Sequence, residues 1–95
     1  MLTERAELLI RSGREEAFAA TMAAEGKPLL LGVPGVLSAR LGRGVENRQK
    51  FMLLVEWTEM AAHEAFSGTD AQSRLRALMS PFTEGGAMEH FEIQP

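Results

Sequence analysis

Residues 51–57 (FMLLVEW) restrict the fold of this chain more than any other segment. Every second position, starting from the first, carries a large apolar side chain: Phe51, Leu53, Val55 and Trp57. The alternate positions include Met52 and Leu54. An antiparallel strand with one face in solvent would instead alternate between apolar and polar residues. We therefore predict a strand in a sheet that is covered on both faces, by helices on one side and by a further layer on the other.

A second copy of the chain is the natural source of that further layer. The chain has 95 residues, which make a single domain (residues 1–95), and no segment is left over to cover the second face. It contains no cysteine, so disulfide bonds cannot stabilise so small a core. Oligomerisation is the other common route to stability. The sequence therefore predicts a homodimer.

The first half of the chain reads as a strand, a helix and a second strand. Residues 2–11 alternate as a strand with one polar face. Ser12 lies three residues before Glu15, the spacing of a capping box, which predicts that a helix begins there. The Lys-Pro pair at 27–28 is expected to break or kink this helix. Residues 36–43, which begin after a Pro-Gly turn, are predicted to form the second strand.

The second half adds two helical pieces and a last strand. A polar hairpin loop at 42–47 leads into the apolar strand. Thr58 is expected to cap a short helix over residues 59–67, and Thr69 with Gln72 forms a second capping box. Pro81 and then Gly85-Gly86 are predicted to end that helix. Residues 88–93 are predicted to form the last strand. The order is that of a split βαβ unit, so we predict an α+β, ferredoxin-like βαββααβ fold with an antiparallel sheet.

Composition excludes several classes of function. The net charge is −3, no basic stripe is visible, and there is no tyrosine to stack on bases, so we predict no nucleic-acid binding. No apolar run is long enough to span a membrane, and the start of the chain lacks a signal-peptide pattern. We therefore expect a cytoplasmic protein with no membrane association. The phosphate-loop, dinucleotide and nucleophile-elbow motifs are absent, so we predict no cofactor.

Four short segments resemble one family. They are VEWTEMAAHEAF (residues 55–66), PGVLSA (34–39), LRAL (75–78) and EHFE (89–92). Together with the element order, they are similar to the antibiotic biosynthesis monooxygenase (ABM) family of small dimeric α/β barrels. The resemblance implies a homodimer and, in some members, cofactor-independent oxidation of anthrones and quinols. Other members degrade haem, and function has to be argued from the site.

The resemblance to the anthrone-oxidising members implies a cleft between sheet and helices with four positions of interest. These members have a strand Asn, a Trp that ends the strand, a Tyr six residues later and an Arg on the later helix. The matching positions here are Leu53, Trp57, His63 and Arg76. The Asn is therefore lost and the Tyr replaced by another hydrogen-bonding residue. The haem-degrading members have an Asn, a Trp and a His. The corresponding places here are Glu7 or its neighbours, Phe66 and Arg76, so the haem-degrading interpretation lacks an axial ligand.

Each candidate residue also has a purely structural interpretation. Trp57 is predicted to form the wall of a flat aromatic site, or else to be a core residue. His63 is predicted to accept a proton, or else to be a buried ring bonded to a carbonyl or to Glu59. Arg76 is predicted to stabilise a substrate anion, or else to extend into solvent.

Two further residues complete the site predicted from the sequence. Met60 and Phe66 share helical spacing with His63, so we place them on the inward face as substrate-binding residues beside Trp57. His90 on the last strand is predicted to be structural. His63 and His90 with a carboxylate such as Glu59 lack the spacing of a ligand motif, so we predict no metal site.

These residues lead to two hypotheses about function. The first is a cofactor-independent monooxygenase acting on a small aromatic, quinol or polyketide-like substrate, with His63 and Arg76 as catalytic residues. The alternative is a non-catalytic dimer that binds a small apolar ligand or has a stress-related or structural role. Leu53 favours the alternative, and the pairing of His63 with Arg76 favours the enzyme.

Overall fold

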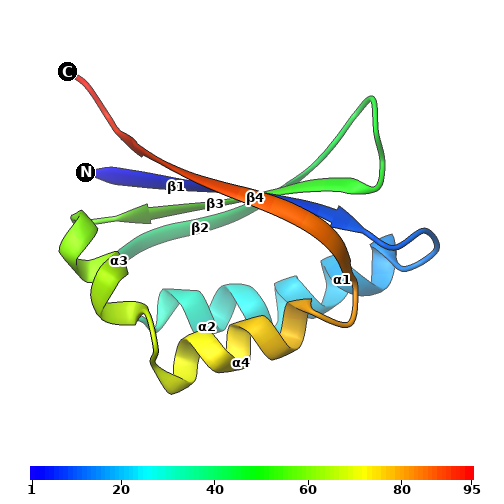
Figure 1. Cartoon of the computed structure of the whole chain (residues 1–95), viewed down its shortest axis with the longest axis horizontal. Coiled ribbons are helices and arrows are strands. Elements are labelled where there is room, and N and C mark those ends of the chain that lie inside the picture. Colours follow the sequence, from blue (N-terminus) through cyan, green and yellow to red (C-terminus); the bar gives the residue numbers. More distant parts are fainter.

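The computed structural model describes residues 1–95. Four antiparallel strands form one sheet in the order β2-β3-β1-β4. The strands are β1 (Leu2–Ile10), β2 (Val36–Arg43), β3 (Lys50–Trp57) and β4 (Thr83–Glu92). All helical segments lie on one face of the sheet (Figure 1): α1 (Glu15–Thr21), the π-helical turn η1 (Met22–Gly26), α2 (Lys27–Leu31), α3 (Met60–Phe66) and α4 (Asp70–Met79). The predicted α+β fold with an antiparallel sheet is confirmed.

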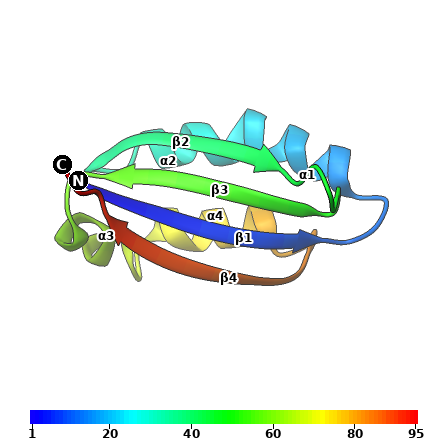
Figure 2. The same ribbon diagram turned by 90° about the horizontal axis from the view of Figure 1, so that it is seen from above.

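The core lies between the inner face of the sheet and the helices. Strand β3 runs through the middle of the sheet beside β1 (Figure 2), and its odd-numbered residues point into this core. Phe18 of α1 packs edge-on against Phe51 and Phe82, with ring centroids 5.0 and 5.8 Å apart. The buried residues are all apolar apart from a single glycine, Gly26 in η1. The apolar odd positions of β3 therefore supply the inner layer that the sequence pattern predicted.

The outer face of the sheet is not covered within the protomer. Figure 1 shows the side opposite the helices open along its length. Met52 and Leu54 of β3 face this side and are half-buried, and Phe91 of β4 is 43% exposed. Apolar side chains on an uncovered sheet face are consistent with the predicted second layer. The homodimer itself stays a prediction.

The first helix begins differently from the prediction. Ser12 does not cap it: Arg14 is the residue before α1, and no side chain caps the helix. Gly13 lies in a turn with φ +87°, in the left-handed region, so helical backbone cannot extend back to Ser12. The predicted capping box is wrong at this position.

The Lys-Pro pair does not end the helix. Helical backbone continues from α1 through η1 into α2, and Pro28 occupies the first turn of α2. The wider π turn just before Pro28 accommodates a residue that has no N–H to donate. In this turn, the N–H of Lys27 donates to the carbonyl of Met22. The expected distortion therefore takes the form of a π turn.

Of the two caps predicted for the later helices, one is correct and one is wrong. The hydroxyl of Thr69 accepts a hydrogen bond from the backbone N–H of Gln72 (3.2 Å), as the capping box predicted. Thr58 caps nothing: Glu59 precedes α3 and no side chain caps that helix. The N–H of Thr58 donates to Gly35 O (2.8 Å), which ties Thr58 to the turn just before β2 instead.

The last strand is longer than predicted. It begins at Thr83, so Gly85 and Gly86 belong to β4 and do not end α4, which stops at Met79 ahead of Pro81. A Cβ on Gly86 would lie 2.6 Å from the carbonyl oxygen of Glu7, so β4 approaches β1 closely here. Gly86 serves strand packing, a role that local sequence does not distinguish from a helix stop. No helix in the structure has both the length and the apolar character to cross a membrane.

Candidate functional site

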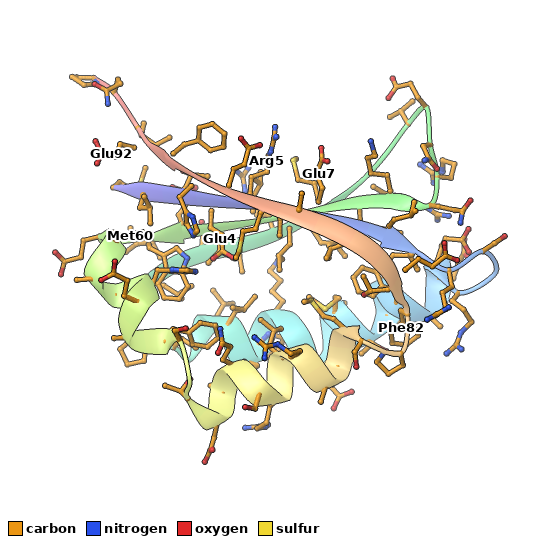
Figure 3. The ribbon with its side chains drawn as sticks, in the orientation of Figure 1. Glu4, Arg5, Glu7, Met60, Phe82 and Glu92 are labelled. Atoms are coloured by element: carbon orange, nitrogen blue, oxygen red, sulfur yellow. The ribbon has the colours of Figure 1, made fainter.

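Three polar side chains from distant parts of the chain meet at one end of the inner sheet face. Glu4 of β1 and His90 of β4 are directly paired across the sheet, and His63 reaches them from α3. His63 Nε2 lies 3.3 Å from His90 Nε2 and 3.6 Å from Glu4 Oε1. Figure 3 shows Glu4 on the helix side of the sheet, with Arg5 and Glu7 on the opposite side. We call Glu4, His63 and His90 the polar triad.

Trp57 contacts two members of the polar triad, Glu4 and His63. Its indole N–H donates a hydrogen bond to Glu4 Oε1 (2.9 Å), and its ring is perpendicular to that of His63, with centroids 5.2 Å apart. The Trp57 side chain is completely buried. Its N–H is therefore occupied by Glu4, and Trp57 supports the site as a core residue behind His63 and Phe66.

The triad is largely shielded from water. The side chains of His63 and Glu4 are 16% and 12% exposed. His63 Nδ1 is buried and has no hydrogen-bond partner, so the polar contacts of this ring run through Nε2. The carboxylate near His63 is Glu4, and the predicted bond to Glu59 is not formed. A histidine nitrogen that faces a carboxylate and a second imidazole can accept a proton or coordinate a metal ion.

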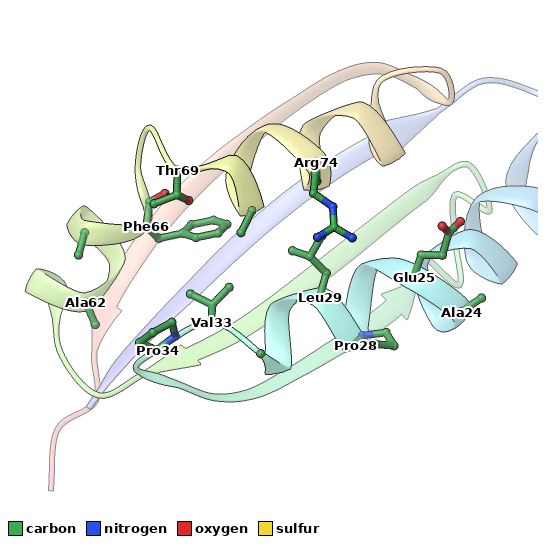
Figure 4. Close-up of a pocket in the computed structure, with 13 residues that line it drawn as sticks. Ala24, Glu25, Pro28, Leu29, Val33, Pro34, Ala62, Phe66, Thr69 and Arg74 are labelled. Carbon is green, nitrogen blue, oxygen red and sulfur yellow. The ribbon is translucent and has the colours of Figure 1, made fainter.

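A separate cleft of about 700 Å³ lies in the helix layer (Figure 4). Leu29 and Val33 line one side of it and Phe66 the other, and Arg74 reaches over it from α4. Its lining is mostly apolar, and His63 is not part of it. Phe66 also contacts Trp57, with ring centroids 5.6 Å apart, so this ring separates the cleft from the triad.

The structure brings together some of the predicted site residues and not others. Trp57, His63 and Phe66 form one aromatic group. Arg76 is exposed on α4, and Arg74 is the arginine that borders the cleft. Arg74 and Arg76 are two residues apart on the helix, so their side chains point in nearly opposite directions. Met60 was expected to face inward, but it begins α3 and is 40% exposed.

Sequence reasoning missed Glu4 and underrated His90. Glu4 has the same parity as Ala6, Leu8 and Ile10, so a carboxylate at an inward position of a strand was the available signal. His90 was set aside because nothing near it in sequence completes a site. Its partners lie 27 and 86 residues away, on α3 and β1, and only the folded chain places them together.

The two family positions occupied by Leu53 and Glu7 lie on opposite faces of the sheet. Leu53, at the position of the family Asn, is buried and lines a cavity of about 250 Å³ between the sheet and the first helical segments. Glu7, at the place of the first-strand Asn of the haem-degrading members, points to the outer face of the sheet. It therefore lies on the opposite face from Phe66, whereas its neighbours Ala6 and Leu8 face the core.

Comparisons with known proteins agree with this fold. Residues 1–78 match the family model described as antibiotic biosynthesis monooxygenase. The chain is 32% identical over 94 residues to the uncharacterized protein YczJ of Bacillus subtilis, covering 97% of this chain and 98% of YczJ. The chain therefore belongs to the ABM family, as its motifs predicted.

Solved structures show the same architecture. A Bordetella bronchiseptica protein that carries the family's name is 27% identical and superposes with a TM-score of 0.88, over 99% of this chain and 97% of that one. A Caulobacter crescentus protein named in the same way is 20% identical, with a TM-score of 0.84 over 99% of this chain and 90% of that one. The second match shows the shared fold alone.

Proposed function

We propose that the protein is a monooxygenase that oxidises a small electron-rich aromatic, quinol or polyketide-like substrate without a bound organic cofactor. The observation that carries this proposal is the position of His63. Its ring is fixed edge-on against Trp57, its Nε2 faces Glu4, and part of the side chain remains open to solvent. Membership in the ABM family supports the same reaction class.

The reaction requires little from the protein beyond proton transfer and positioning. His63 Nε2 takes a proton from an acidic C–H or O–H of the substrate, leaving an electron-rich carbanion or phenolate. For a CH₂ group between aromatic rings, this anion reduces O₂ and forms a C–O bond, giving a hydroperoxide once a proton is added. Loss of water then leaves a ketone. The substrate supplies all the electrons, so one oxygen atom enters the product and the other leaves as water.

Glu4 is positioned to interact with the proton that His63 accepts. Its Oε1 lies 3.6 Å from His63 Nε2, in a site that is mostly shielded from water. Trp57 keeps that carboxylate in place through its N–H. Phe66 is proposed as the aromatic contact for the substrate and Met60 as a contact at the exposed edge. The role of Arg76 as the partner of the substrate anion stays a prediction.

We also propose that the working form is a homodimer joined through the outer sheet face. That face carries half-buried Met52 and Leu54 and the exposed ring of Phe91. Burying such side chains against a second copy stabilises both chains through the hydrophobic effect. Light scattering at micromolar concentration should give about twice the chain mass, and a stable monomer would contradict this arrangement.

A second candidate function rests on the cleft in the helix layer. Its apolar lining and its volume of about 700 Å³ suit a small apolar ligand, and it contains no histidine to act as a base. Arg76 lies in solvent and Leu53 is in the core, as a non-catalytic binding protein would allow. On this alternative, the chain binds such a ligand and does not oxidise it.

Oxygen uptake by the metal-free protein separates the two candidates. The assay uses chelator-treated wild type with a panel of anthrones, hydroquinones and naphthols. Because positioned bases contribute roughly 10²–10⁴-fold, His63→Gln should reduce uptake by about 10²-fold or more. Glu64→Gln, on an exposed neighbour of His63, is the matched control and should behave as wild type.

The arginines are tested in the same assay. Arg76→Ala lowers uptake if Arg76 contacts the substrate anion, and Arg74→Ala lowers it if substrate occupies the cleft in the helix layer. Absence of uptake over the whole panel, with the dimer intact, would reject the oxygenase and favour the ligand-binding protein.

A further inference from the structure

We propose that Glu4, His63 and His90 form a binding site for a divalent metal ion such as zinc. The three side chains come from β1, α3 and β4, and each offers one ligand atom, all within 4.8 Å of one another. Two imidazoles and one carboxylate are ligands that zinc commonly uses. The site goes beyond the proposed oxidation, and its existence does not depend on that reaction.

The distances agree with a shared ion. Two nitrogens bound to one tetrahedral zinc at about 2.05 Å each are about 3.3 Å apart. The observed separation of His63 Nε2 and His90 Nε2 is 3.3 Å. Glu4 Oε1 lies 3.6 Å from His63 Nε2, which the same bond lengths allow at an angle of about 120°. The ligand atoms of Glu4 and His90 lie within 4.8 Å of each other. Two zinc bonds span at most about 4.1 Å, so an ion binds all three groups once these side chains move to within that distance.

The surroundings hold the ligands in place before any ion arrives. Trp57 is fully buried, and its N–H orients the Glu4 carboxylate at 2.9 Å. Hydrogen bonds of this kind, from residues behind the ligands, commonly orient metal-binding carboxylates and histidines. Glu4 and His90 are paired residues on neighbouring strands, so their backbones are fixed by the sheet ladder. Ligands on rigid strands lose little conformational freedom when they bind.

One feature limits the affinity. His63 Nδ1 is buried without an acceptor, whereas metal-binding histidines usually donate this N–H to a partner. Loss of such a partner typically lowers metal affinity by about 10–100-fold. We therefore expect weaker binding than at a structural zinc site with a complete outer shell. Three protein ligands also leave a fourth position open to water or to a small ligand.

Metal binding and proton transfer would compete for the same atom. An ion on His63 Nε2 occupies the lone pair that the proposed oxidation uses to take a proton. This consequence rests on the proposed function, whereas the site itself does not. Zinc added in equal amount to the protein should therefore suppress oxygen uptake by the metal-free enzyme, and Glu64→Gln should be suppressed in the same way.

Calorimetric titration of the untagged, chelator-treated protein with zinc chloride tests the site without any substrate. We expect one ion per chain. His63→Ala and His90→Ala should each weaken binding by at least about tenfold, and Glu4→Gln should weaken it as well. Glu64→Gln is the matched control and should bind as wild type does. Cobalt(II) in place of zinc should give a visible absorption band that is lost in the His90→Ala variant.

Three results would overturn the metal site. They are no saturable binding to wild type, a stoichiometry other than one ion per chain, or unchanged binding in both histidine variants. Circular dichroism of each variant shows whether it is folded. If His63→Ala is unfolded, His90→Gln on the edge strand decides the question, since unchanged affinity there rejects the site. Because no substrate is present, failure of the oxidation and failure of the metal site are separate results.

Discussion

The hydrogen bond between Trp57 and Glu4 can be measured by a double-mutant cycle. Trp57→Phe removes the indole N–H and part of a completely buried ring. A hydrogen bond to a charged group contributes about 1.5–3 kcal/mol, and the missing ring atoms add about 1–2 kcal/mol. We therefore expect the free energy of unfolding to fall by about 3–4 kcal/mol. That is a large part of the roughly 5–14 kcal/mol typical of a chain of this length.

Glu4→Ala and the double variant separate the bond from the cavity. Glu4→Ala leaves the Trp57 N–H buried without an acceptor, which costs about 1–3 kcal/mol. In the double variant that cost disappears, so the two single effects should not add, and we expect a coupling energy of about 1.5 kcal/mol or more.

The assay for this cycle is urea unfolding followed by circular dichroism. All four proteins are measured with chelator and at one protomer concentration, since metal binding and dimerisation both shift apparent stability. Leu31→Ala, at an exposed position, is the control and should change stability by less than about 0.5 kcal/mol. Additive single effects, with a coupling energy near zero, would refute the reasoning that Trp57 anchors the carboxylate of the polar triad.

Two paired substitutions test the local structure in the same unfolding assay. Thr69→Ala should cost about 1 kcal/mol because it removes the cap of α4, whereas Ser12→Ala should cost almost nothing, and equal effects would contradict the assignment of the caps. Gly35→Ala and Gly13→Ala both place a Cβ at positive φ, but only at Gly35 does this atom collide with Ala62. Each should lose about 1–2 kcal/mol from backbone strain, and Gly35→Ala should lose more; a smaller loss at Gly35 would contradict the packing of α3 against this turn.

Local patterns predicted most of the fold because they depend on neighbours along the chain. The alternation in residues 51–57 marks a strand whichever partners it has, and Thr69 with Gln72 closes a cap within one helical turn. The failures occur where a distant contact decides. Gly86 looks like part of a helix stop, but it packs against the Glu7 backbone of another strand. Ser12 has the right spacing for a cap, but the turn at Gly13 keeps it outside the helix.

The candidate site was predictable only in part. The family motif identified Trp57 and His63, and the structure places these two rings against each other. The same motif suggested Arg76, which lies in solvent, because helical phase at the border of an apolar stripe does not settle which arginine borders the cleft. Glu4 carried one signal, a charge on the apolar side of a strand, but nothing in the sequence named its partners.

By itself, the sequence determined the element order, the apolar inner face of the sheet and the family. These follow from side-chain periodicity and short motifs, which act over a few residues. Only the tertiary structure decided that a glutamate and two histidines share one polar site. Strand pairing brings Glu4 beside His90, and the packing of α3 on the sheet end adds His63. Such convergence depends on register and packing between segments far apart in the chain, and the spacing of residues along the sequence does not predict it.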